Sequence, residues 1–358
     1  MIERSENMGM WRLSLESVCS RLIPFALAIV VLSSPLQISA APQFIGGPIL
    51  GFLPDQNGTV IRPIMGIPGA STPGQPLKLS VDILGATISP RQDYAIASRS
   101  ADAQVVVIDL TADPPAINAV SGTSFNAGLV ATSPTGSAAA VYDSASGTVE
   151  MIGGLPHSAA VVAGFNISSI SSAPVTGLAI SDDGTIALVK VSDSQNTGLW
   201  VLSSNSPWPI SLDRPSAANF FPNRHDAVVT DDSTRTAYLL MDIDHAASQI
   251  PLASAQDGIE SFSSVAVAED GKRVFLADAS SGWITTVDVQ TQTSILTSCQ
   301  CRPTGLYRLS GSSVFRLTEP SEGPTMLLDA SLGDPRIGII PPATAEARPQ
   351  EHHEVISE

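Results

Sequence analysis

The chain has 358 residues, and its 34 Asp and Glu outnumber its 18 Lys and Arg, which gives a formal net charge of −16 at pH 7. An acidic field of this size disfavours unaided binding to nucleic acid or to an anionic membrane surface. The length would allow two domains, but no linker interrupts the middle of the chain, and all-β folds of this size occur as single domains. We therefore predict one domain.

Residues 1–40 have the pattern of a secretory signal peptide. Arg12 and Arg21 precede an apolar run of eleven residues, Leu22–Leu32, and small residues follow it. The run is too short to span a bilayer, so no integral membrane anchor is expected after cleavage near Ala40. We expect an extracytoplasmic protein, either periplasmic or secreted.

Beyond the signal, one pattern returns along the chain: an apolar alternating stretch, a small polar turn and a second apolar alternating stretch. It is clearest in residues 175–191 and 263–278. Asp and Ser in such turns hydrogen-bond the local backbone and Gly accepts a positive φ, so these residues close hairpins. Successive units align at one turn position, with spacings of 44, 48, 49, 38 and 40 residues between Gln92, Gly136, Gly184, Ser233, Gly271 and Gly311.

Each unit contains four short stretches rich in Val, Ile, Thr and Ala, as in residues 263–299. Four antiparallel strands in a unit of about 40 residues are typical of a β-propeller, whereas a solenoid of β-rungs would usually have a shorter period. The predicted fold class is all-β, a propeller of four-stranded antiparallel blades in residues 41–342. The polar residues 343–358 are predicted to be a disordered tail.

The two ends of the repeat region predict how the ring closes. Residues 47–66 match the second and third strands of a unit and have no first strand before them, while residues 305–330 and 335–342 supply three strands and one more. Six repeats and an incomplete N-terminal one predict seven blades, with six blades as the alternative. The N- and C-terminal strands must then be adjacent, with Ile49 and Ile340 on the same side of the molecule.

The aligned units resemble the YVTN and WD40-like repeats of secreted bacterial β-propellers. The apolar-x-Ser-Pro/Asp-Asp-Gly hairpin of those repeats is matched by Ile180–Val189 and Val267–Ala277. The resemblance covers residues 45–342 and implies the fold, because related propellers serve as binding scaffolds, lactonases and surface proteins. Tyr-Val-Thr-Asn itself and a regular Trp-Asp pair are absent, so no family site residue is carried over.

Cys299 and Cys301 are the two cysteines that remain after export. In an oxidising compartment two such thiols usually pair, yet cysteines separated by one residue lie near the limit of disulfide geometry. A local disulfide and a pair of buried reduced thiols both stay open. A metal or redox site is disfavoured, because no His lies within forty residues on either side.

Asp242, Asp244 and His245 lie close together and offer oxygen and imidazole ligands. Alternation would place the two carboxylates on one face of a strand, while the alternative, which we favour, is a strand end that runs into a solvated loop. No Asp-x-Asp-x-Asp-Gly calcium loop occurs, and acidic turns such as Asp182–Asp183 are explained by hairpin chemistry. No cofactor is therefore expected, and Ca²⁺ is the one metal considered.

Arg224, His225 and Asp226 form the second polar group of interest. The pattern predicts that they begin an inner strand, which would direct polar groups toward a ligand in the central channel. The alternative, which we favour, is an ordinary polar strand start at the mouth of the ring.

No Gly-x-Ser-x-Gly elbow, His-Glu-x-x-His helix or P-loop is present to indicate an enzyme. We expect an exported, monomeric scaffold that binds a protein or a small ligand without catalysis. The rivals are a propeller enzyme of the lactonase or hydrolase type, with its site in the central channel, and a structural cell-surface component. Three or more acidic, His or Asn side chains that meet in one axial pocket would favour the enzyme, and an apolar or Ser-lined channel would favour the scaffold.

Overall fold

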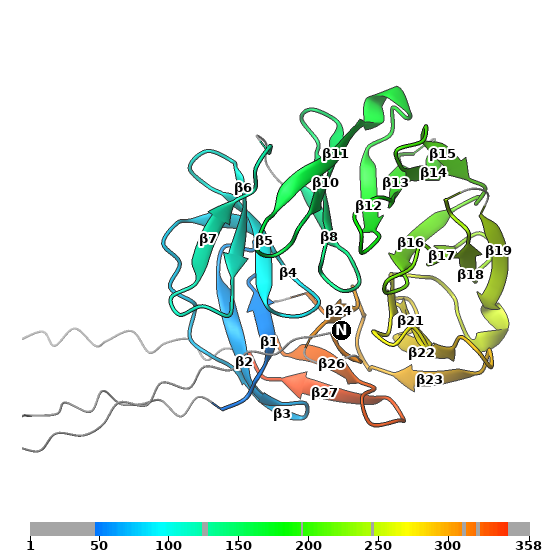
Figure 1. The fold of residues 1–358 in the computed structure, drawn as a ribbon. Coiled ribbons are helices and arrows are strands. Elements are labelled where there is room, and N and C mark those ends of the chain that lie inside the picture. Colours follow the sequence, from blue (N-terminus) through cyan, green and yellow to red (C-terminus); the bar gives the residue numbers. More distant parts are fainter. Residues whose placement is uncertain are drawn as a thin grey trace, which may run out of the picture. The chain divides into compact units, whose positions relative to one another are not determined.

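The computed structural model describes residues 47–123, 128–194, 196–244, 247–309, 313–319 and 323–342. Within these ranges the strands form seven antiparallel sheets that follow one another around a central axis, as Figure 1 shows. The prediction of an all-β, seven-bladed propeller is confirmed. The signal peptide and the tail lie outside the described residues and stay predictions.

Each blade consists of consecutive strands, which we call A to D from the axis outward. Blade 1 contains β1 (Ile49–Pro54), β2 (Ile61–Ile67) and β3 (Ala70–Pro73); blade 2 contains β4 (Ile83–Ile88), β5 (Tyr94–Arg99), β6 (Val105–Asp109) and β7 (Ala116–Ala119); blade 3 contains β8 (Leu129–Thr132), β9 (Ala139–Asp143), β10 (Thr148–Gly153) and β11 (Ala160–Asn166). The short 3-10 helix η1 (Ile167–Ser169) follows blade 3.

The remaining blades repeat the four-strand order. Blade 4 contains β12 (Val175–Ile180), β13 (Ala187–Ser192), β14 (Thr197–Leu202) and β15 (Trp208–Ile210); blade 5 contains β16 (Pro215–Phe220), β17 (Ala227–Asp231), β18 (Thr236–Met241) and β19 (Ser248–Ala253); blade 6 contains β20 (Ser264–Val267), β21 (Arg273–Asp278), β22 (Trp283–Asp288) and β23 (Ser294–Ser298); blade 7 contains β24 (Tyr307–Arg308), β25 (Val314–Arg316), β26 (Thr325–Asp329) and β27 (Arg336–Ile340). The second 3-10 helix, η2 (Ala255–Asp257), precedes blade 6. No helix in the described residues is long and apolar enough to cross a membrane.

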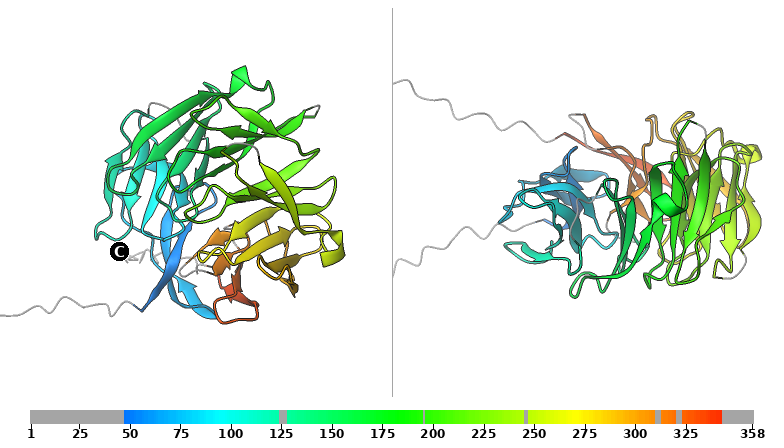
Figure 2. Two further views of the ribbon diagram at one scale, coloured as in Figure 1. Left: turned by 45° about the vertical axis from the view of Figure 1, so that its right-hand side comes forward. Right: turned by 90° about the horizontal axis from the view of Figure 1, so that it is seen from above.

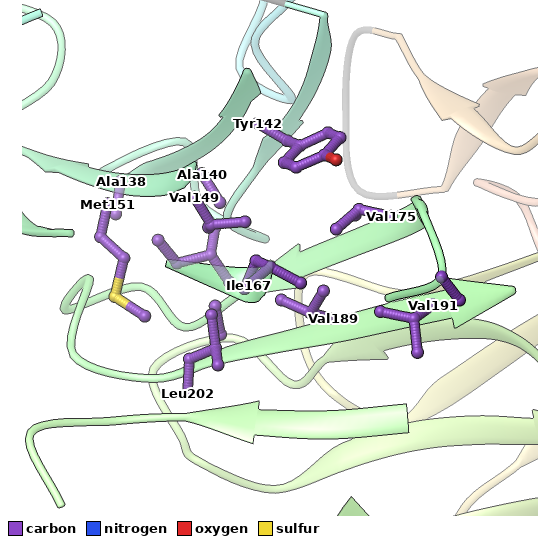
Figure 3. Packing of buried hydrophobic residues seen from close by; sticks show 13 residues of the cluster. Ala138, Ala140, Tyr142, Val149, Met151, Ile167, Val175, Val189, Val191 and Leu202 are labelled. Carbon is purple, nitrogen blue, oxygen red and sulfur yellow. The ribbon is translucent and has the colours of Figure 1, made fainter. Parts of the chain in front are cut away.

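The core is divided among the interfaces between neighbouring blades. Both faces of a blade are covered by its neighbours, so middle strands such as β9 and β17 are buried at every position. Figure 3 shows one interface, where Val149 and Met151 of blade 3 pack with Val189 and Leu202 of blade 4. Burial on both faces explains why β9 and β17 begin with consecutive apolar residues that do not alternate with polar ones.

The turn between strands A and B is the repeated element of the fold. Its first residue donates N–H to the carbonyl five positions later, at Asp55, Ser89, Ser133, Ser181, Phe221, Ala268 and Leu309. We call the end of the propeller that carries these turns, and the C–D loops beside them, the A–B face. Figure 2 shows the propeller from two further sides.

This turn corrects two of the alignments made from the sequence. Ser233 lies in the B–C turn between β17 and β18, whereas the A–B turn of blade 5 consists of residues 221–226. Arg224 therefore replaces Ser233 in the alignment. The spacings between aligned turn positions from Gln92 to Gly271 become 44, 48, 40 and 47 residues. Asp55 begins an A–B turn, so β1 is the innermost strand of blade 1, and the strand that blade 1 lacks is the outermost one. Both errors arise because A–B and B–C turns use the same Asp, Ser and Gly chemistry.

The ring closes between blade 7 and blade 1. Leu50 and Ile64 of blade 1 share a buried cluster with Leu309 and Ile340 of blade 7, so the first and last strands lie on the same side, as predicted. Strand β27 hydrogen-bonds only within blade 7, so no strand is shared across this seam in the described residues. Closure therefore depends on side-chain packing.

Candidate functional site

A cleft of about 590 Å³ opens on the A–B face. It is formed by the A–B turns of blades 3, 4 and 5 and by the C–D loop of blade 5. Its residues, which we call the acidic cleft, are Ser137, Asp182, Asp183, Asn223, Arg224, His225, Asp226, Asp242 and Asp244. Five carboxylates thus surround one Arg and one His, and the cleft is suited to positively charged groups.

His225 joins two blades at the centre of the acidic cleft. Its Nδ1 lies 2.7 Å from Asp244 Oδ2 in blade 5, and its Nε2 lies 2.8 Å from Asp183 Oδ2 in blade 4. Burial alone would lower the pKa of His225, but the hydrogen bonds to Asp244 and Asp183 outweigh burial and raise the pKa above its ordinary value. A doubly protonated ring can donate to both carboxylates at once.

Asp182 and Asp183 do more than close their own hairpin. Asp183 accepts from Ser181 Oγ and from Thr185, and these bonds together with His225 outweigh burial and lower the pKa of Asp183 to about 2. Asp182 accepts from the backbone N–H of Thr135 in blade 3, at 2.7 Å, and of Asn223 in blade 5, at 2.7 Å. Hairpin chemistry is therefore only part of the explanation, because the same carboxylates also join three blades.

The structure corrects the placement of the Arg224–Asp226 group. These residues do not begin an inner strand; they belong to the A–B turn that follows the inner strand β16. The guanidinium of Arg224 lies over the ring of Phe221, 5.2 Å from its centroid, and 3.6 Å from the carboxylate of Asp226. The group therefore lines the acidic cleft and not the wall of the central channel.

The two aspartates of the other polar group also lie in the acidic cleft. Asp242 follows the end of β18 with a φ of 57°, which ends the strand, so Asp242 and Asp244 occupy the C–D loop, as the favoured alternative predicts, and not one strand face. His245 lies outside the described residues. Two motifs nearly 20 residues apart in the sequence thus form one site through the contact between His225 and Asp244.

The acidic cleft provides no metal centre. No group of three or more His, Cys, Asp or Glu side chains in the described ranges is arranged to hold a metal ion. Two of its carboxylates are already hydrogen-bonded by His225, and Asp182 is occupied by backbone N–H groups. These contacts give no basis for a Ca²⁺ proposal.

Cys299 and Cys301 form a disulfide in the structure, with their Cα atoms 5.1 Å apart. The bridge lies between β23 and β24, in the connection from blade 6 to blade 7. The N–H of Cys299 donates to the carbonyl of Gly282, whose φ of 73° and close approach to Cys301 leave no room for a side chain. The pair thus fixes this connection against the B–C turn of blade 6.

The central channel holds a cavity of about 520 Å³ lined by the inner strands. Its two acidic residues, Asp55 and Glu319, lie at opposite ends. Asp55 is occupied by Thr59 and Val60 of its own turn, while Glu319 contacts Tyr307 and Arg316 at the opposite end from the A–B turns. The remaining lining combines small or apolar residues, such as Ala179 and Val265, with polar ones, such as Gln92 and Asn219.

Sequence patterns did not indicate two polar residues of the channel, Gln92 and Arg308. Gln92 has a φ of 62° at a position where several other blades have Gly, and its side chain accepts from Phe52 N–H and donates to the Arg308 carbonyl. The repeat alignment places Gln92 at the Gly position of the turn, but its side-chain contacts with residues 40 and 216 positions away cannot be seen in the sequence.

Raising the pH should weaken the contact between blades 4 and 5 at His225. Because the pKa of His225 is raised by folding, its stabilisation is complete below the ordinary pKa of about 6.5 and is lost as the pH rises through the folded-state pKa. We expect the free energy of unfolding to fall as the pH rises above about 6.5, and His225→Gln to reduce this slope. Urea denaturation at a series of pH values measures both slopes.

The matched control is His157→Gln, because His157 is exposed and has no hydrogen bond to a carboxylate in the described residues. This variant should keep the wild-type slope. Equal slopes for His225→Gln and the wild type would show that the two carboxylates do not hold the histidine in its charged form.

Comparison with solved structures supports the fold. The chain is similar to a functionally unknown protein from Desulfotomaculum acetoxidans DSM 771, with 13% identity over 82% of this chain and 99% of that one and a TM-score of 0.55. It is also similar to the β-propeller domain of Cps50 (Swd1) from Myceliophteria thermophila, with 11% identity over 72% of this chain and 86% of that one and a TM-score of 0.50. No family model and no curated protein sequence matches the chain. By its fold, the chain is a seven-bladed β-propeller with WD40-like structural neighbours.

Proposed function

We propose that this protein is an exported, non-catalytic scaffold that binds a positively charged segment of a protein partner in the acidic cleft of the A–B face. The observation that carries the proposal is the convergence of five carboxylates from two blades around one cleft. The predicted signal peptide supports a location outside the cytoplasm. The arrangement of the channel supports the scaffold over the lactonase or hydrolase alternative, because its two acidic side chains, Asp55 and Glu319, lie at opposite ends in the described residues.

The acidic cleft is built on rigid elements, which favours binding. Three of its carboxylates, those of Asp182, Asp183 and Asp226, lie on A–B turns fixed by backbone hydrogen bonds, so little conformational entropy of these turns is lost when a ligand binds. Asp242 is exposed and has no hydrogen-bond or ion-pair partner in the described residues, so its charge is available. The net charge of −16 would also speed the approach of a basic partner.

A tetralysine peptide is expected to bind the full chain, and the same peptide with acetylated lysines is expected to bind much more weakly, because acetylation removes the charges. Asp242→Asn should weaken binding of tetralysine by roughly two- to five-fold, the effect of one exposed charge pair. Asn tolerates a positive φ, so the substitution should leave the loop in place. Isothermal titration calorimetry at low and high salt measures these affinities.

The matched control is Asp82→Asn, because Asp82 is exposed and precedes β4 at the end of the propeller away from the A–B turns. This variant should bind tetralysine as the wild type does. Equal affinity for the charged and acetylated peptides, or equal losses in both variants, would rule out the acidic cleft as the binding surface.

A further inference from the structure

Arg308 reaches across the central channel near its A–B end. It lies on the inner strand β24 of blade 7. One guanidinium nitrogen donates to the carbonyl of Pro134 in blade 3, at 3.1 Å, and another donates to the carbonyl of Val267 in blade 6. Arg308 and its two partners belong to three blades, so the guanidinium is held in the channel and not at the outer surface.

The charge of Arg308 has no carboxylate partner. No Asp or Glu oxygen in the described residues lies within 4.0 Å of its guanidinium, and three of its five N–H groups find no acceptor there. Burial lowers the pKa of Arg308, although the more distant charges of Glu269 and Asp182 oppose this effect. The surroundings therefore compensate the positive charge of this half-buried guanidinium only partly.

The walls of the channel complete a small-molecule site. Each inner strand pairs with a neighbour on one side only, so its other edge presents backbone N–H and C=O groups toward the axis. Many of the side chains along these strands are small and apolar, as at Ala86, Ala131, Ala179, Ala218 and Ala266. A cavity of about 520 Å³ with the charge of Arg308 near its A–B end and apolar stretches in its walls has the size and character of a small-ligand pocket.

We propose that the central channel binds a small organic acid, whose carboxylate pairs with the guanidinium of Arg308 and whose apolar body lies against the inner strands. A carboxylate matches the planar fork of a guanidinium and supplies the missing negative charge. This site is separate from the acidic cleft and goes beyond the proposed function, because it takes an anion, whereas the cleft takes a cation.

The test compares phenylacetate and hexanoate with their neutral amides, phenylacetamide and hexanamide, by calorimetric titration of the full chain. The acids are expected to bind roughly ten- to hundred-fold more tightly than the amides, as charge-assisted hydrogen bonds predict. Arg308→Gln should remove this difference. Arg336→Gln changes an exposed arginine of β27 outside the channel and should leave the difference unchanged.

The comparison of acid with amide on the wild-type protein needs no variant, so it stands even where Arg308→Gln fails to fold. Equal binding of acids and amides, or no binding of either, would overturn the proposal. An acid preference that persists in Arg308→Gln would overturn the role of Arg308. This experiment uses neither tetralysine nor Asp242→Asn, so a negative result for the channel does not bear on the proposal for the acidic cleft.

Discussion

Replacing Asp278 by alanine is expected to lower the free energy of unfolding by about 2–4 kcal/mol, the cost of leaving four partly buried N–H groups without their acceptor. Asp278 ends β21, and only 4% of it is exposed. Its carboxylate accepts from the N–H groups of Glu260, Ser261, Ser280 and Ser281 at 2.8–3.2 Å. One side chain thus holds both its own B–C turn and the connection that enters blade 6.

The stabilisation by Asp278 should depend on pH. Burial would raise the pKa of Asp278, but the hydrogen bonds that it accepts prevail and lower the pKa below its ordinary value. The stabilisation is therefore complete above the ordinary pKa of about 4 and is lost as the pH falls through the folded-state value. Urea denaturation at neutral and at acidic pH should show a large difference between wild type and Asp278→Ala at neutral pH only.

Asp288→Ala is the matched control for Asp278→Ala. Asp288 also accepts from turn N–H groups, those of Gln290 and Thr291, but it lies in the C–D turn of the same blade, where water can replace it. Asp288→Ala should lower the free energy of unfolding much less than Asp278→Ala does. Similar losses in the two variants would show that the turn contacts, and not the buried connection into blade 6, account for the effect.

The sequence predicted the hairpin role of such aspartates but not their second role. Asp143 and Asp278 lie at B–C turns of the same Asp, Ser and Gly composition, and each accepts from N–H groups in its own turn. Asp231 and Asp278 also accept from the segment that precedes their blade, 17 or 18 residues earlier. Periodicity reveals a turn because the turn is local, whereas a contact with the preceding connection depends on how the blade folds back.

The acidic cleft shows the same limit more strongly. His225 meets Asp183, which lies 42 residues earlier, and Asp182 meets Thr135, which lies a further 47 residues earlier. Each blade contributes a few residues, so no short motif describes the site. Blade 5 was misaligned because its A–B turn has no Gly and uses Asn223 at a φ of 55°, while the B–C turn after Asp231 has the expected polar composition.

The ring as a whole should depend on the seam between blades 7 and 1. Ile340 is fully buried there, in one cluster with Leu50 and Ile64, and no strand hydrogen bond crosses the seam in the described residues. Ile340→Ala should therefore lower the free energy of unfolding by about 2–5 kcal/mol, the usual cost of a cavity in a packed core. Chemical denaturation measures the loss.

Ile339→Ala is a control from the same strand, because Ile339 is 54% exposed and points away from the core. It should have little effect, since exposed apolar side chains add little stability. Comparable losses of stability in Ile340→Ala and Ile339→Ala would mean that the buried side chain of Ile340 does not close the seam.

The alternative support for the seam is Gln92, which links Phe52 of blade 1 to Arg308 of blade 7. If Gln92→Ala destabilises the protein more than Ile340→Ala, polar contacts near the channel, and not the apolar cluster, close the ring.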